Sequence, residues 1–174
     1  MKSVGWNGNE ASPAKVKYHL ANRNGMVRQR KPYDLIYLMT VEFLISILTF
    51  YSAVIMIVAV ATGSESDRLG LIGPDAPAWV LDDPSQALTV FSIIFMALAL
   101  VSFLLLWGFL RARSFSWMTG ILASIATTAV GLAAILTLGY DDTQTFFRYV
   151  ILVIAPMFVI YLLARQDIKA YLLR

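Results

Sequence analysis

Four long apolar stretches, separated by short polar segments, dominate the chain. They cover residues 35–62, 87–110, 115–138 and 143–164. Each is long enough to cross the hydrocarbon core of a bilayer as an α-helix, which takes about 20 predominantly apolar residues. The pattern therefore predicts an all-α fold in which four transmembrane helices form a bundle.

The polar segments between and around these stretches divide the chain. Residues 63–86 are rich in Gly, Pro and Asp, which are turn and breaker signals, and Pro84 stands just before the second stretch. We expect a basic N-terminal segment (1–34), a four-span domain (35–164) and a C-terminal tail (165–174).

The N-terminal segment carries the signals of one further, short helix. Ser12 is a suitable N-cap, Pro13 suits the first helical position and Gly25 suits the residue past the end. Val16 and Leu20 fall one turn apart between them. We therefore expect a cytosolic helix of about three turns, lying against the membrane surface or a partner subunit.

The distribution of positive charge predicts the orientation in the membrane. Twelve Lys and Arg residues lie in the N-terminal segment, the turn between the second and third stretches, and the tail. Arg68 and Arg148 are the two on the opposite side. Because basic residues accumulate in cytoplasmic loops, we expect a multi-pass protein of the cell membrane with both termini in the cytoplasm.

The composition excludes several classes of function. Hydrophobic residues make up 59% of the chain and charged residues 14%, so a soluble enzyme or a nucleic-acid reader is excluded. The net charge of +3 comes from the predicted cytoplasmic face, which would meet lipid headgroups. With no cysteine, one histidine and no common catalytic motif, we predict no cofactor, no metal site and no catalytic residue.

Glu42 is the ionisable residue that lies well inside the first stretch. An acid inside a membrane is a functional-site hypothesis by default, because burying its charge in hydrocarbon is costly. One interpretation is structural, with the carboxyl group protonated, reaching the interface or paired with a basic residue on the same side. The other is a proton or cation relay. The basic residues that could pair with it are Arg111, Arg113, Arg165 and Lys169.

Arg148 lies about one and a half turns inside the fourth stretch, near the predicted outer interface. Its side chain could extend to the interface, with Asp141 or Asp142 as an ionic partner. Alternatively, it contacts an anion or a partner protein. Glu42 is an unsuitable partner because the two residues are predicted near opposite faces of the membrane.

The third stretch carries small residues at helical spacing. Gly120, Ser124 and Thr128 recur every four residues, and Gly131 lies on the adjacent ridge. Small residues let a neighbouring helix approach closely, and their hydroxyls can bond across the contact. We therefore expect this helix to be the packing centre of the bundle.

Pro156 lies in the middle of the fourth stretch. It removes a backbone hydrogen bond and crowds the preceding turn, so a kink is expected there. A static kink that fits the bundle and a hinge for gating are the two interpretations.

Three segments resemble a family of small four-helix membrane proteins found in archaea and bacteria. They are the basic-Pro entry into the first helix at residues 30–44, the aromatic-basic-Trp turn at 107–117 and the end of the last helix at 161–171. The resemblance implies four spans with both ends inside. The family is uncharacterised, so the resemblance implies no activity.

Together these features favour a non-catalytic accessory or structural subunit of a larger integral membrane complex, for example of respiratory or oxidase type. Its partners would be the lipid bilayer and other membrane subunits, in a hetero- or homo-oligomer, with no nucleic acid. The alternative is a small transporter or channel subunit that uses Glu42 and the helix kinked at Pro156.

Overall fold

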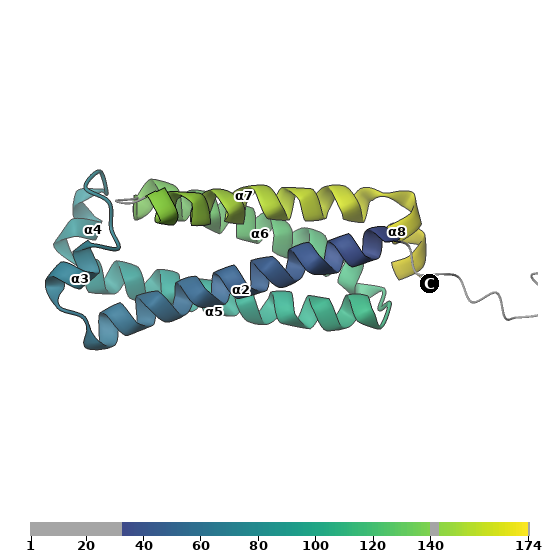
Figure 1. Cartoon of the computed structure of the whole chain (residues 1–174), viewed down its shortest axis with the longest axis horizontal. Coiled ribbons are helices and arrows are strands. Elements are labelled where there is room, and N and C mark those ends of the chain that lie inside the picture. Colours follow the sequence, from purple (N-terminus) through teal and green to yellow (C-terminus); the bar gives the residue numbers. More distant parts are fainter. Residues whose placement is uncertain (1–32, 140–142, 174) are drawn as a thin grey trace, which may run out of the picture. The chain divides into compact units, whose positions relative to one another are not determined.

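The computed structural model describes residues 33–139 and 143–173, which belong to one compact unit, Pro32–Arg174. The described residues form helices and no strand, so the prediction of an all-α fold is confirmed (Figure 1). The helix proposed near Ser12 lies outside the described residues. The helices are α2 (Tyr33–Thr62), α3 (Glu65–Leu69), α4 (Ala78–Asp82), α5 (Pro84–Leu110), α6 (Phe115–Thr137), α7 (Thr143–Ala164) and α8 (Gln166–Leu172).

Four of these helices, α2, α5, α6 and α7, are long and apolar enough to cross a membrane. The chain is thus a multi-pass membrane protein whose spanning helices contact lipid. Consecutive spanning helices run antiparallel, so one end of the bundle carries α3 and α4 and the opposite end carries α8 (Figure 1). We call these the α4 end and the α8 end.

The four spanning helices form a ring in which each one has two main neighbours. The most extensive contacts join α2 to α5 and α6 to α7, and smaller contacts between α2 and α7 and between α5 and α6 close the ring. Our expectation that the third stretch is the packing centre is therefore wrong. In such a ring each helix packs mainly against two neighbours, so no single helix occupies the middle.

Buried positions on α2 repeat every three or four residues along the whole helix. This spacing is that of helices which pack at a shallow crossing angle, with side chains of one helix inserted between those of the next. The repeating buried residues are Leu35, Leu38, Glu42, Ile45, Thr49, Ser52, Met56 and Ala59.

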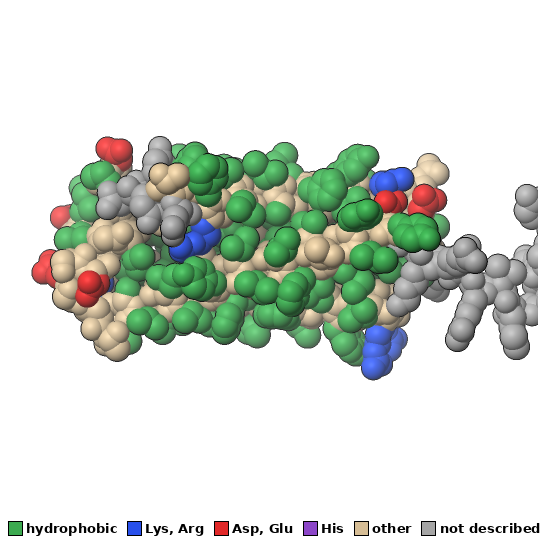
Figure 2. Space-filling model, viewed as in Figure 1, with side chains coloured by type: hydrophobic (Ala, Val, Ile, Leu, Met, Phe, Trp, Pro, Cys, Tyr) green, Lys and Arg blue, Asp and Glu red, His purple; other side chains and the backbone are tan. Residues whose placement is uncertain are grey.

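The outward faces of the spanning helices are apolar. Leu104 on α5, Leu136 on α6 and Ile154 on α7 are 64%, 76% and 60% exposed. Hydrophobic side chains cover the middle of the visible face, while charged side chains gather towards its two ends (Figure 2). An apolar belt between charged ends is the surface that a bilayer requires.

The segment between α2 and α5 folds back over the α4 end. Ile72 and Val80 are buried there, and the Gly73 amide donates a hydrogen bond of 2.6 Å to the Leu138 carbonyl at the end of α6. Gly139 has a φ of +68°, and a Cβ atom on it would lie 3.2 Å from the Gly73 Cα atom. The turn signals in the sequence thus mark a folded segment with three buried side chains, those of Ile72, Ala76 and Val80.

The predicted C-terminal tail is folded at the α8 end. Ile168 and Leu172 on α8 are fully buried. Arg165, which precedes α8, forms an ion pair of 2.7 Å with Asp34 at the start of α2. The tail therefore belongs to the bundle core as far as Leu172.

Candidate functional site: a central polar layer

Two clusters of apolar side chains fill the bundle, one towards each end. The cluster at the α4 end includes Ala53, Met56, Phe91, Phe95, Ala134, Tyr149 and Leu152. The cluster at the α8 end includes Leu35, Leu38, Ile45, Leu105, Phe109, Ala123, Val159, Leu163, Ile168 and Leu172.

Every spanning helix carries polar residues or proline in the stretch between the two clusters. These are Ser46, Thr49 and Ser52 on α2, Ser102 on α5, Ser124 and Thr127 on α6, and Pro156 on α7. We call the six hydroxyl residues together with Glu42 the central polar layer, and all seven side chains are at most 4% exposed.

Glu42 is 2% exposed and comes from one of the repeating buried positions of α2. Its side chain shares a hydrogen bond with the hydroxyl of Ser102 on α5. The two residues thus join the helices of the most closely packed pair. A polar group buried away from water needs such a partner, because its unpaired atoms would cost free energy.

The ion pairs that the sequence allowed for Glu42 are absent from the described residues. Arg165 instead pairs with Asp34, and two other basic side chains lie over aromatic rings at the α8 end. The guanidinium of Arg111 is 4.9 Å from the centre of the Trp107 ring, and the Lys169 ammonium is 5.0 Å from that of Trp117. These contacts occupy the basic groups near the membrane surface, whereas Glu42 lies deeper.

Several hydroxyls of the layer are satisfied within their own helices. Ser46 donates to the Glu42 carbonyl at 2.8 Å, and Thr49 donates to the Ile45 carbonyl at 2.8 Å. Ser52 differs, because its hydroxyl is the buried side-chain polar atom without a partner in the described part of the chain. Hydroxyls bonded to the preceding turn are a common way to place Ser and Thr inside a membrane helix.

Apolar side chains enclose the layer from both ends. Leu38, Leu105 and Phe109 lie towards the α8 end and are at most 1% exposed. Phe95 and Leu152 lie towards the α4 end and are fully buried. Since the α8-end cluster also includes residues of α8 itself, the enclosure involves the folded tail.

The small residues of the third stretch are placed mainly against α7. Gly120, Ser124 and Gly131 are buried, whereas Thr128 is half-buried and donates to the Ser124 carbonyl within α6. A Cβ atom on Gly131 would lie 3.3 Å from the carbonyl carbon and oxygen of Leu152. At this point the backbones of α6 and α7 come close together.

Pro156 is buried, and α7 continues across it from Thr143 to Ala164. Proline has no N–H, so the Leu152 carbonyl four residues earlier loses its usual helical donor. That carbonyl faces Gly131 on α6. The close approach of a glycine backbone covers this part of the helix, as neighbouring helices do at proline positions in membranes.

Arg148 is half-buried on α7, with its guanidinium 5.1 Å from the centre of the Tyr51 ring on α2. No ion pair joins Arg148 to a carboxylate of the described residues. Asp141 and Asp142, the partners considered from the sequence, lie outside those residues.

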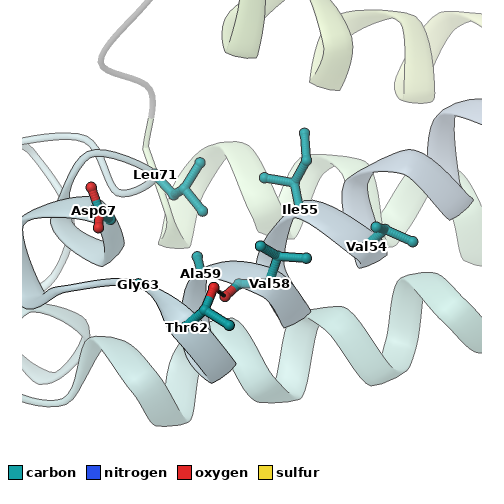
Figure 3. A pocket seen from close by; sticks show the side chains of 8 residues that line it. All are labelled: Val54, Ile55, Val58, Ala59, Thr62, Gly63, Asp67 and Leu71. Carbon is teal, nitrogen blue, oxygen red and sulfur yellow. Dashed lines mark hydrogen bonds between the residues drawn. The ribbon is translucent and has the colours of Figure 1, made fainter.

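A hollow of about 400 Å³ lies between the second half of α2 and α3 (Figure 3). Apolar residues of α2, such as Val54 and Val58, form much of its wall, and Asp67 contributes a carboxylate from α3. This carboxylate accepts hydrogen bonds of 2.8 Å from both the amide and the hydroxyl of Ser64, which lowers the pKa of Asp67. Ser64 and Asp67 thus form a capping box at the N-terminus of α3.

Sequence reasoning identified Glu42 and Ser124 but missed most of the layer. Ser46, Thr49, Ser52 and Ser102 are common residues in membrane helices, and no motif marks them. The spacing of residues along α2 could have identified two of them. A repeat of three and four residues places Thr49 and Ser52 on the face of α2 that carries Glu42. Among the described residues, no group of three or more His, Cys, Asp or Glu side chains could hold a metal ion.

Comparisons with known protein families, curated proteins and solved structures find no match to this chain. The four long apolar helices support a small four-span membrane protein, and the family suggested by the three sequence segments stays a hypothesis.

Proposed function

We propose that this protein is a non-catalytic structural subunit of a larger integral membrane assembly. The enclosure of the central polar layer is the observation that carries the proposal. Buried apolar side chains such as Leu38 and Phe95 close this layer at both ends, which argues against a continuous polar path through the part of the bundle that the structure describes. Its hydrogen bonds then serve to hold the helices together.

The outer surface offers room for partner helices. A groove of about 510 Å³ between α2 and α5 has mainly apolar walls. Transmembrane helices associate by close van der Waals packing, so grooves between helices are suitable contact sites for further spans.

Photo-crosslinking in the native membrane tests the proposal. A photoreactive residue is placed at one outward position on each spanning helix, namely Ile57, Leu104, Leu136 or Ile154, all of which are exposed. We expect at least one position to give a crosslink to another membrane protein of defined mass. Native mass spectrometry after mild solubilisation should then find that protein in a fixed ratio to this chain.

The buried residue Leu38 provides the matched control, because its side chain is fully enclosed and should crosslink only within the chain. Lipid adducts alone at all four outward positions, together with a single chain or a homo-oligomer in native mass spectrometry, would contradict the proposal.

A second candidate function is transport of a proton or cation. The observation that favours it is the row of hydroxyls that follows Glu42 along α2 and ends at Ser52, whose hydroxyl has no partner among the described residues. Proton or cation flux into proteoliposomes tests this function. Flux that is lost in Glu42→Gln but persists in Ser46→Ala would support transport over the structural role.

A further inference from the structure

Arg148 is a guanidinium group without a hydrogen-bond acceptor or ion-pair partner among the described residues. Its contact is the face of the Tyr51 ring, at 5.1 Å, and Tyr51 is itself 51% exposed on the outward surface of α2. The charge therefore lies towards the lipid side of the bundle. An arginine inside a spanning segment is costly unless an anion or polar group reaches it.

Arg68, at the same end of the bundle, shows how this fold satisfies a guanidinium when it can. Its N–H groups donate to the carbonyls of Ala59 and Val60 at the end of α2, at 3.2 and 3.0 Å, and to the Ser85 hydroxyl at 2.9 Å. A positive charge at a helix C-terminus is favourable, so Arg68 needs no further partner. Arg148 has no comparable set of acceptors in the described residues.

An apolar groove leads away from Arg148 between α2 and α7. It has a volume of about 570 Å³. The residues that line it are Val41, Leu44, Ile47, Leu48, Ile151, Ile154, Ala155 and Phe158. None of these residues is polar.

The guanidinium lies in line with this groove, at its α4 end. Leu48 and Ile151 are groove residues, and Tyr51 and Arg148 come three residues further on, in the same direction, on the antiparallel helices α2 and α7. Three residues are slightly less than one helical turn, so the stacked pair extends the same two helix faces. The surface thus presents a positive charge at one end of an apolar trough that runs along the helices.

We propose that this surface binds one phospholipid molecule, with its phosphate on the Arg148 guanidinium and an acyl chain in the groove between α2 and α7. Phosphate oxygens accept the paired N–H groups of a guanidinium well, and charge-assisted bonds of this kind are strong away from water. The groove runs along the spanning helices, as an acyl chain does in a bilayer.

The test uses the full chain in nanodiscs of phosphatidylcholine and phosphatidylglycerol in equal amounts, followed by native mass spectrometry of the released protein. We expect the protein to retain one phospholipid. Diacylglycerol, which has the same chains and no phosphate, should compete at least about tenfold less well, as expected for the loss of a charge-assisted hydrogen bond.

Two substitutions address the two halves of the site separately. Arg148→Gln should lower phospholipid retention at least about tenfold for the same reason. Ala155→Phe fills the groove and should also lower retention while leaving Arg148 in place. Ala97→Phe fills the groove between α2 and α5, which has a similar volume, and should leave retention unchanged.

Thermal unfolding followed by tryptophan fluorescence checks that each variant is folded. If Arg148→Gln does not fold, Arg148→Lys and Ala155→Phe decide, and unchanged retention in Ala155→Phe would overturn the proposal. Equal retention by the unmodified protein and Arg148→Gln would also overturn it. Loss of a co-purifying protein in Arg148→Gln, with lipid retention unchanged, would overturn it as well. Arg148 would then bind a carboxylate of that protein.

Discussion

Glu42 is a buried carboxyl group whose partner is a hydroxyl on the neighbouring helix. Its contact with Ser102 joins α2 to α5, whereas Ser46 bonds to the carbonyl of Glu42 within α2. Glu42 thus stabilises the contact between two helices, whereas the hydrogen bond of Ser46 only satisfies its own hydroxyl within α2.

Replacing Glu42 separates the size of the side chain from its charge. Glu42→Gln keeps the volume and a hydrogen bond to Ser102, so we expect it to lower the free energy of unfolding by less than about 1 kcal/mol. Glu42→Ala leaves a cavity and an unpaired Ser102, and should cost about 2 kcal/mol or more. Unfolding in bicelles by a denaturing detergent, followed by tryptophan fluorescence, measures both.

Ser46→Ala is the control for this pair, because it removes a hydroxyl that bonds only within α2, and it should cost less than Glu42→Ala. If Glu42→Gln proved as damaging as Glu42→Ala, the ionised carboxylate itself would be needed. Our account of the Glu42–Ser102 contact, in which an uncharged group of the same volume is sufficient, would then fail.

Asp67 makes the cap of α3 sensitive to pH. Hydrogen bonds from Ser64 lower the pKa of Asp67 below its ordinary value of 3.8. The cap of α3, formed by Ser64 and Asp67, therefore favours the ionised form of Asp67. The cap therefore contributes its full stability above about pH 3.8 and loses it as the pH falls through the lower, folded pKa. Amide hydrogen exchange in α3, measured against pH, should show protection that decreases only below pH 3.8.

Asp67→Asn keeps an oxygen that can accept from the Ser64 amide but cannot titrate. We expect its protection of α3 to be independent of pH over the same range. A midpoint at or above the ordinary pKa of an aspartate in the unmodified protein would show that the cap does not favour the ionised form.

At the scale of the helices, the contact between α6 and α7 depends on two glycines in different surroundings. A Cβ atom on Gly120 would lie 2.9 Å from the Leu163 Cδ1 atom and 3.1 Å from the Phe109 Cζ atom. One on Gly131 would lie 3.3 Å from backbone atoms of Leu152. The tips of side chains can rotate away, whereas the backbone of α7 can yield only if the two helices separate.

We therefore expect Gly131→Ala to destabilise the bundle more than Gly120→Ala, although the nearest contact at Gly120 is shorter. Overpacking at Gly131 should cost about 1–3 kcal/mol, and the cost at Gly120 should stay below about 1 kcal/mol. Unfolding in bicelles measures the difference. Gly70→Ala, whose nearest neighbour would lie 3.4 Å away on an exposed helix end, is the control and should be nearly neutral.

At the scale of the whole molecule, two closely packed helix pairs are combined into one bundle. The pairs are α2 with α5 and α6 with α7, and they meet through the smaller contacts of the ring. The folded tail reinforces this arrangement, because Arg165, just before α8, forms an ion pair of 2.7 Å with Asp34 at the start of α2. Both apolar clusters contain residues from both pairs.

The orientation of this bundle in the membrane is a prediction from its charges. Because the chain has no cysteine, Asp75→Cys and Gln166→Cys each introduce a single thiol, at opposite ends of the bundle and on exposed residues. With both termini in the cytoplasm, an impermeant maleimide should label the variant at Asp75 in intact cells. The variant at Gln166 should react only after permeabilisation, and its labelling in sealed cells would reverse the orientation.

The sequence alone was sufficient to predict the number and the extent of the spanning helices. The third and fourth stretches, predicted at 115–138 and 143–164, match α6 (Phe115–Thr137) and α7 (Thr143–Ala164) within one residue. The physical reason is that lipid cannot satisfy backbone polar groups, so a long apolar segment must be helical. Its length is set by the thickness of the bilayer.

Only the tertiary structure decided which residues face one another. In a soluble bundle the apolar side of each helix identifies the core, but here the outward faces are apolar as well, as the exposed Leu104 illustrates. The sequence therefore could not reveal that Glu42 meets Ser102, or that Arg165 prefers Asp34. These contacts depend on how far each helix is rotated about its axis and shifted along it. Both are determined by the side chains of the helices that pack against it.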